Sequence, residues 1–344
     1  MHMADALLSP AVGTAMCAFG AAANAYAIKK IKKDDLSEKK IPLMGVMGAF
    51  VFAAQMINFT IPATGSSGHI GGGILLAAMI GPFPALLSMS AVLVIQCLFF
   101  ADGGLLALGC NIFNTGVIPC LIVYPLIFGP LTKKGLGVGR ITGASVASAI
   151  VGLQLGAFCV VLQTLLSGIA ELPFGTFLAL MQPIHLAIGV AEGFITAAVL
   201  CFVYKMRPEI MESASEKKAM GAVSMRNVLV ALALATVLLG GVLSIFASTH
   251  PDGLEWSIEK TIEKTAGENG PEAEGAIFEG AASIQNAVAL MPDYDFKDKD
   301  AEKEGSGTGT AVAGIVGGAL TFALAGACAF GISAYKKRRK GAAA

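Results

Sequence analysis

Met1 and His2, the first two residues of the chain, can together chelate a metal ion. The α-amine of Met1, the backbone amide nitrogen of His2 and Nδ1 of its imidazole can close fused five- and six-membered rings. These three nitrogens are coplanar and leave one equatorial position open. Such a field suits Ni(II) or Cu(II), with low-spin Co(II) close behind, and is poor for Ca(II) or Mg(II). We therefore expect a transition-metal site at this end of the chain.

His69 is the histidine that we expect to supply the fourth donor. It lies in a Gly- and Ser-rich stretch, residues 64–73, which predicts a loop flexible enough to reach a distant terminus. Bulky His2 should preserve Met1, because initiator methionine is normally removed only before small residues. Residues 1–10 carry no Lys or Arg, so no basic region typical of a cleavable signal peptide precedes the first apolar stretch.

The composition indicates the elements that must position this site. Hydrophobic residues make up 55% of the 344-residue chain and charged residues 14%, and the mean hydropathy is +0.71. Several apolar runs approach or exceed the ~20 residues that cross a bilayer. We therefore expect an all-α polytopic membrane protein and exclude a soluble globular fold. The predicted spans are 10–28, 43–63, 69–83, 84–101, 112–132, 141–166, 180–204, 227–247 and 311–335.

Lysine and arginine between the spans predict the orientation. They cluster after the first, fifth, seventh and ninth predicted spans, which lie on one side if the spans alternate. The N-terminus is then outside and the C-terminus cytoplasmic. The loop with His69, the loop 102–110 and the loop 169–177 face outward with Met1 and His2.

Two modules and a linker are expected along the chain. Residues 1–205 form a seven-helix bundle, and residues 206–226 form a charged cytoplasmic linker. Residues 227–344 form a second module, in which two spans flank a polar extracellular segment, residues 248–308. Parts of this segment, near 256–264 and 276–290, are predicted to be helical.

Other function classes find little support. The net charge is zero and no basic, aromatic-rich surface suggests a nucleic-acid partner. The seven cysteines form no Cys-x-x-Cys pair, which argues against thiolate ligation or a disulfide scaffold.

Four stretches carry a family resemblance: residues 1–10, the Gly-rich loop around His69, residues 111–116 and residues 185–193. Together they resemble the CbiM/NikM family, the substrate-specific components of energy-coupling-factor transporters for nickel and cobalt. The later part, with Pro251-Asp252-Gly253-Leu254 between two spans, resembles the small companion subunit of the same systems, fused here to the first.

The resemblance implies a metal site, partners and a location. Carried over residue by residue, the ligands are Met1, His2 and His69, and the bound ion is the transported substrate. The chain has no Gly-x-x-x-x-Gly-Lys-[Ser/Thr] phosphate loop, so ATP hydrolysis is expected on separate subunits. A transmembrane coupling subunit and two cytoplasmic ATPase subunits are the implied partners, in the inner membrane of a prokaryotic cell. We expect Ni2+ to be favoured over Co2+, although the ligand types alone do not separate the two ions.

Several amide side chains, two histidines and a glutamate outside the ligand set also lie in or near the predicted spans. Amides near the predicted outer ends can hydrogen-bond the ligands or the N-terminal segment, or instead join helices. These amides are Gln55, Asn58, Gln96, Asn111 and Asn114. His185 and Glu192 share one helical face, and we expect a structural pair or a docking role for them. His250 is expected to be solvated.

The first predicted span carries a face of small residues. Alanines at three- and four-residue spacing in the first span, from Ala11 to Ala25, allow close approach by a partner bundle or by helices of this chain.

A stand-alone secondary metal transporter or channel would need a line of ionisable residues through the membrane. An intramembrane metalloenzyme would need a His-Glu-x-x-His motif, which is absent. A carboxylate site using Asp5, Asp102 or Glu171 is the alternative to nitrogen ligation.

Overall fold

The computed structural model describes residues 2–31, 40–216, 225–265, 271, 273–297 and 307–341, so Met1 lies outside the described residues. Nearly all regular structure is helical. The helices are η1 (Asp5–Leu7), α1 (Pro10–Lys30), α2 (Lys40–Gln55), α3 (Gly73–Ile80), α4 (Pro82–Phe100), α5 (Leu108–Ile112), η3 (Phe113–Phe128), α6 (Gly129–Thr132), α7 (Val138–Ser167), α8 (Phe174–Met206), α9 (Pro208–Glu216), α10 (Arg226–Gly241), η4 (Leu243–Phe246), α11 (Gly253–Thr265), α12 (Ala276–Val288), η5 (Pro292–Tyr294) and α13 (Thr308–Gly341). The strands β1 (Phe59–Ile61) and β2 (Ser66–Gly68) pair antiparallel, with Thr60 opposite Ser67.

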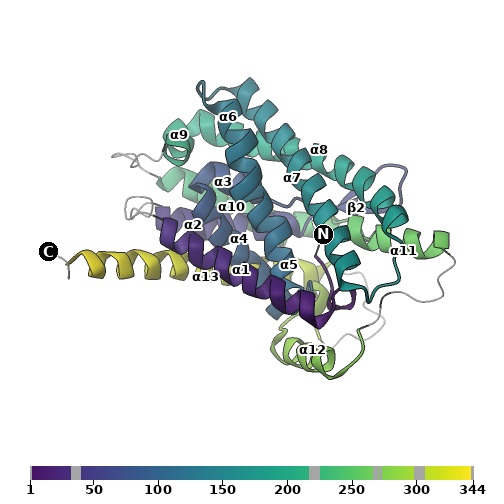
Figure 1. Cartoon of the computed structure of the whole chain (residues 1–344). Coiled ribbons are helices and arrows are strands. Elements are labelled where there is room, and N and C mark those ends of the chain that lie inside the picture. The colour runs from purple at the N-terminus through teal and green to yellow at the C-terminus, as the bar shows by residue number, and fades with distance from the viewer. Residues whose placement is uncertain are drawn as a thin grey trace.

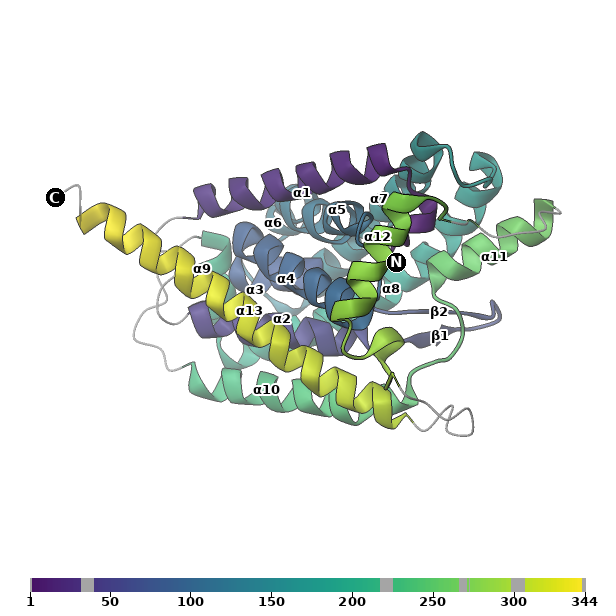
Figure 2. The same ribbon diagram turned by 90° about the horizontal axis from the view of Figure 1, so that it is seen from below.

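Seven helical segments in the described ranges are long and apolar enough to cross a membrane. Five of them precede residue 207 and two follow residue 225. The long helices form one bundle, while α12 lies across one end of it (Figures 1 and 2). The prediction of an all-helical, many-span fold is confirmed.

Two of the nine predicted spans are shorter than expected. The predicted span 43–63 ends as a helix at Gln55, and the chain then enters the β1–β2 hairpin. The predicted span 69–83 is reduced to α3, which has 8 residues, about 12 Å of helix. Glycines with positive φ, Gly72 (78°) and Gly81 (88°), stand at its two ends and interrupt the apolar run. The tight turn expected at Gly81 is present, and α4 begins directly after it.

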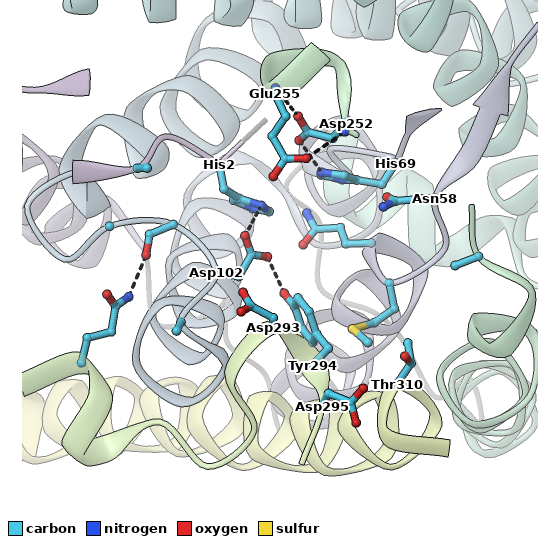
Figure 3. Close-up of a pocket in the computed structure, with 18 of the residues that line it drawn as sticks. His2, Asn58, His69, Asp102, Asp252, Glu255, Asp293, Tyr294, Asp295 and Thr310 are labelled. Atoms are coloured by element: carbon cyan, nitrogen blue, oxygen red, sulfur yellow. Dashed lines mark hydrogen bonds and ion pairs between the residues drawn. The ribbon is translucent and has the colours of Figure 1, made fainter. Parts of the chain in front are cut away.

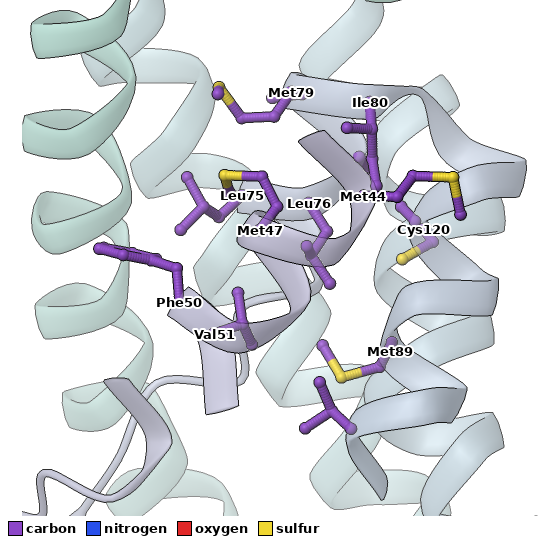
Figure 4. Close-up of a cluster of buried hydrophobic side chains, with 14 of the residues drawn as sticks. Met44, Met47, Phe50, Val51, Leu75, Leu76, Met79, Ile80, Met89 and Cys120 are labelled. Carbon is purple, nitrogen blue, oxygen red and sulfur yellow. The ribbon is translucent and has the colours of Figure 1, made fainter. Parts of the chain in front are cut away.

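Helix α2 lies at the centre of the bundle. Fourteen of its 16 residues are buried, and its apolar side chains pack with those of α3, α4 and η3 (Figure 4). This cluster is rich in methionine, including Met44, Met47 and Met79, whose flexible side chains fill irregular gaps.

The two C-terminal spans complete the burial of α2. Gly45 and Gly48 of α2 lie against Phe322 and Thr321 of α13, where an added Cβ would stand 3.0 and 3.3 Å from the nearest atoms. Helices α10 and α13 meet at Gly240 and Gly314, where an added Cβ would overlap the facing backbone. Small residues that allow such approach are typical of membrane helix packing.

The bundle has two chemically different ends. The start of α1, the β1–β2 hairpin, α11 and α12 lie at one end, whereas α9 and the end of α13 lie at the other (Figure 2). Basic residues gather at the second end, where Lys336 donates to the carbonyls of Ile28 and Ile31. The expected linker includes helix α9, whose Ile210 and Met211 are buried, and residues 217–224 of the linker lie outside the described residues.

Candidate metal-binding site

The structure brings His2 and His69 together although they come from distant parts of the chain. Their imidazole rings stack with centroids 5.3 Å apart and an interplanar angle of 9°. Both side chains are almost buried, with 7% and 11% of their surface exposed. They line the same cavity between the two modules (Figure 3).

The N-terminal segment is fixed in the bundle by backbone and side-chain hydrogen bonds. The Met3 amide donates to Oδ1 of Asn111 (2.8 Å), and Nδ2 of Asn111 donates back to the Met3 carbonyl (3.2 Å). The Gly104 amide also donates to the Met3 carbonyl (2.9 Å). In η1, Oδ1 of Asp5 accepts the Ala107 amide (2.9 Å). His2 is therefore held by its chain neighbours at a defined place.

The hydrogen bonding of His69 selects the tautomer that a metal ligand needs. Its Nδ1 lies 3.0 Å from the carbonyl oxygen of Ile70, and a carbonyl can only accept. Nδ1 therefore carries the hydrogen, and Nε2 carries the lone pair. Burial is the main cause that lowers the pKa of His69 to about 3, so the ring is neutral near pH 7. Donation of one ring N–H to a carbonyl is the usual outer contact of a metal-binding histidine.

His2 is paired with an acid. Its Nδ1 lies 3.1 Å from Oδ1 of Asp102, in the loop after α4. The other oxygen of Asp102 accepts a hydrogen bond from the hydroxyl of Tyr294. Burial acts to raise the pKa of Asp102, but the charge of His2 and the hydrogen bonds from His2 and Tyr294 outweigh it and lower the pKa. The nitrogen required for the chelate thus faces Asp102 in this structure.

Tyr294 belongs to a segment of the C-terminal module, residues 285–294, that is hydrogen-bonded to the end of α4 and the loop after it. Gln285 of α12 donates to the carbonyls of Cys97 and Gly103, both at 2.8 Å. The Leu290 and Met291 amides donate to the Phe99 carbonyl at 2.9 and 3.1 Å. The Tyr294 ring stacks on Phe100, with centroids 5.0 Å apart. This segment therefore fixes the loop that carries Asp102.

The same module places a second carboxylate beside His69. Oδ2 of Asp252 lies 3.9 Å from Nε2 of His69. Oδ1 of Asp252 accepts the amides of Leu254 and Glu255, and Oε2 of Glu255 accepts the Asp252 amide. This reciprocal arrangement is a capping box at the start of α11.

The β1–β2 hairpin is where α11 docks on the first module. The Ser67 amide donates to the Pro251 carbonyl (2.8 Å), and its hydroxyl donates to the His250 carbonyl (2.8 Å). Nε1 of Trp256 donates to the Thr64 carbonyl (2.9 Å). These bonds hold Asp252 next to the turn that carries His69.

The shared cavity has a volume of about 820 Å³ and an acidic lining. No Lys or Arg of the described chain lines it. Its carboxylate residues are Asp5, Asp102, Asp252, Glu255, Glu279, Asp293 and Asp295. One-signed charge around a cleft raises the local concentration of cations.

The five predicted amides serve the two expected roles, and Asn114 serves both, because its Nδ2 also donates to Sδ of Met3 in the N-terminal segment (3.7 Å). Asn111 binds the N-terminal segment, and Gln55 donates to the Gly71 carbonyl near His69 (2.8 Å). Gln96 supports Gln55 by donating to its side-chain oxygen (2.8 Å). Asn114 joins helices by exchanging hydrogen bonds with Gln163, at 2.8 and 3.2 Å. Asn58 lines the cavity, and its carbonyl accepts the Ser248 amide (2.8 Å).

His185 and Glu192 share a helix face, as expected, but bind different partners in the described residues. Nδ1 of His185 donates to the Met181 carbonyl of its own helix (2.8 Å). Glu192 accepts backbone amides of the His69 turn. His250 has an exposed side chain, as predicted. Glu171 is exposed in the loop between α7 and α8 and does not line the cavity.

The glycines of the His69 stretch correct one expectation. We expected them to give flexibility, but they allow close packing. A Cβ at Gly68 would lie 2.5 Å from Ile188, one at Gly72 would lie 2.6 Å from Val51, and one at Gly73 would lie 2.5 Å from Pro119. The turn is therefore wedged between helices.

Four residues at the site were not predicted from the sequence or were predicted in another role. Asp102 was considered only as a ligand of an alternative carboxylate site. Asp252 and Glu255 show the Asp-x-x-Glu pattern of a capping box, which predicts a helix start but no contact with His69. Tyr294 carries no local signal, because its partner Asp102 is 192 residues away in sequence.

Comparison with known protein families matches both parts of the chain. Residues 2–210 match the family model of CbiM, the cobalt uptake substrate-specific transmembrane region. Residues 226–334 match the PDGLE domain.

Individual relatives match over most of the chain. A relative from Archaeoglobus fulgidus, provisionally named fused nickel transport protein NikMN, is 30% identical over 94% of this chain and 96% of its own length. The cobalt transport protein CbiM of Geobacter sulfurreducens is 30% identical over 79% of each chain.

A crystal structure of a truncated transition-metal transporter is similar in fold. It superposes with a TM-score of 0.53 at 29% identity, over 60% of this chain and 99% of its own. The many-span fold, the match over residues 2–210 and these relatives agree. The chain is a multi-pass membrane protein that belongs to the CbiM family of metal-uptake components, with a PDGLE domain fused at its C-terminal side.

Proposed function

We propose that this protein captures Ni2+ at the outer face of the membrane, as the substrate-specific component of an energy-coupling-factor transporter. The proposed ligands are the α-amine of Met1, the amide nitrogen and Nδ1 of His2, and Nε2 of His69. The observation that carries the proposal is the stacking of the His2 and His69 rings, 5.3 Å apart, beside an acid-lined cavity. In this assignment Asp102 releases Nδ1 of His2 when the metal binds.

The proposal also assigns an orientation and partners. The N-terminal segment, the hairpin and α11 lie outside, and the basic end of the bundle lies in the cytoplasm, as the distribution of Lys and Arg favours. Coupling and ATP hydrolysis reside on a transmembrane subunit and two ATPase subunits. Alanines 11, 15, 18, 22 and 25 of α1 are exposed in the structure, which supports docking of a partner helix there.

Cobalt is the second candidate substrate. It is supported by the cobalt transport name of the Geobacter relative. We favour nickel because a planar field with a deprotonated amide nitrogen suits Ni(II) especially well. Competition between the two ions for the purified protein, with the bound metal measured by mass spectrometry, separates these assignments.

An N-terminal extension tests the proposal. One residue added before Met1 converts the amine into an amide and moves the imidazole out of its chelate position. Isothermal titration of the extended protein should show loss of high-affinity nickel binding, with an unchanged thermal unfolding midpoint. Undiminished affinity would remove the amine from the site. A matched control carries the same residue at the C-terminus.

A further inference from the structure

Glu192 of α8 contacts the turn that carries His69. Only 3% of its surface is exposed. Oε2 accepts the Gly71 amide (2.8 Å) and Oε1 accepts the Gly72 amide (2.9 Å). These amides follow His69 by two and three residues, and Gly72 is the N-cap of α3. The positive end of α3 adds to the attraction for the carboxylate.

The carbonyl of Gly71 is held by a chain of two hydrogen bonds between side-chain amides and the backbone. Nε2 of Gln55, from α2, donates to the Gly71 carbonyl (2.8 Å). Nε2 of Gln96, from α4, donates to Oε1 of Gln55 (2.8 Å). Three helices, α2, α4 and α8, therefore fix both backbone polar groups of Gly71. Its position follows from the bundle itself.

The backbone of the turn packs closely against its neighbours. A Cβ at Gly71 would lie 3.3 Å from Oε2 of Glu192. Gly72 combines a φ of 78° with close contact to Val51. A carboxylate buried in a membrane protein is costly and is kept where it serves function. Both carboxylate oxygens of Glu192 accept hydrogen bonds from the His69 turn.

We propose that Glu192 is a positioning residue for metal capture. By holding the Gly71 and Gly72 amides, it keeps the His69 imidazole where Nε2 completes the nitrogen set begun by Met1 and His2. Glu192 itself does not contact the metal. This inference rests on the proposed function, because it requires His69 to be a ligand.

Glu192→Gln is the sharpest substitution. The glutamine side chain has nearly the same shape, but only its oxygen can accept. Its amide group would face one of the two backbone N–H groups, so the turn would lose a bond and move. Loss of a partner that orients a ligand typically weakens metal affinity by about 10- to 100-fold. Glu171→Gln, in an exposed loop, is the matched control.

The experiment is a double-mutant cycle on the full chain in detergent. Nickel affinity is measured by isothermal titration for wild type, Glu192→Gln, His69→Ala and the double variant. The His69→Ala protein retains the Met1 and His2 nitrogens, so its weaker binding is measured at higher nickel concentrations. The visible absorption of the bound nickel reports whether the fourth nitrogen is present.

We expect Glu192→Gln to weaken binding about 10-fold or more in wild type and less than about twofold in the His69→Ala protein. Its nickel absorption should shift toward that of His69→Ala. Unchanged affinity in Glu192→Gln would overturn the inference, as would an equal loss in both backgrounds. If His69→Ala itself leaves affinity unchanged, the ligand assignment of the proposed function falls, and the inference falls with it.

A second variant covers the case in which Glu192→Gln does not fold. Gln55→Met keeps the side-chain length but removes the donor to the Gly71 carbonyl. It should weaken nickel binding in wild type and not in the His69→Ala background. Equal effects in both backgrounds would overturn the proposed role of the turn.

Discussion

Nδ1 of His2 lies 3.1 Å from Oδ1 of Asp102, although the proposed chelate uses this same nitrogen. The pKa of Asp102 is lowered, so its carboxylate is ionised near pH 7 and can only accept. Nδ1 must therefore carry a hydrogen in this arrangement. In the proposed chelate the metal would take the place of this hydrogen and of the contact with Asp102, and Nε2 of the same ring, which has no hydrogen-bond partner among the described residues, could carry the hydrogen instead.

Nickel binding at pH 7 should release protons to the buffer. They come from the His2 amide and from the Met1 amine, because metal ligands must be deprotonated. Isothermal titration in two buffers of different ionisation enthalpy measures the number. An observed enthalpy that is the same in both buffers would contradict the exchange. His2→Ala is the control and should bind weakly with fewer protons released.

Substitution of the two loop histidines should have unequal effects. His69→Ala removes the fourth donor and should weaken nickel binding at least ~10-fold, since loss of even an outer partner costs that much. His250→Ala should change affinity little, because its side chain is exposed and its hydrogen bonds with Ser67 and Ser248 are made by its backbone. Titration calorimetry compares the two. Equal losses would contradict the assignment of His69.

The pairing of His2 with His69 could be predicted because it follows from residue chemistry. An N-terminal Met-His unit supplies three nitrogens by itself, and a chain with four histidines leaves few candidates for the fourth. The long apolar runs likewise predicted most helices, and the helices near Trp256 and after Gly275 in the polar segment were also found. These features depend on local sequence.

The rest depends on contacts between distant segments. Whether the apolar run after Gly68 spans the membrane is decided by Gly72 and Gly81, whose positive φ values the run itself does not reveal. The place of Tyr294 is set by Asp102 and Phe100 in the other module. Such contacts join residues far apart in the sequence, so no local pattern predicts them.

The pH dependence of nickel binding should come from the N-terminal ligands, with no contribution from His69. The pKa of His69 is lowered to about 3, so this ring stays neutral from pH 8 to 6 and does not titrate there. The amine titrates near ~8 in unperturbed form, and the His2 amide must also lose its proton when the metal binds. Acidification from pH 8 to 6 should therefore weaken binding by well over about tenfold, as protons reoccupy the N-terminal groups.

His69→Ala provides the internal check on this prediction. It should lower the affinity at every pH but leave the slope of log affinity against pH unchanged. A clearly shallower slope in His69→Ala would show that His69 titrates in this range. A flat profile in the wild-type protein would favour the carboxylate alternative, since such groups ionise near ~4.

Trp256→Phe tests how far the PDGLE domain stabilises the first module. The substitution keeps most of the apolar packing but removes the hydrogen bond from Nε1 to the Thr64 carbonyl (2.9 Å). Loss of one such bond should lower the free energy of unfolding by about 1 kcal/mol. For a chain of this size the thermal midpoint, measured by intrinsic fluorescence of tyrosine or by circular dichroism in detergent, should fall by roughly 2 °C. Glu259→Gln, exposed on the same helix, is the control and should leave the midpoint unchanged.

The nickel affinity of Trp256→Phe should change less than about threefold, because Gln55 and Glu192 hold the His69 turn without Trp256. A large loss of affinity with an unchanged midpoint would instead show that the hairpin contact, rather than the buried clamp, sets the position of His69.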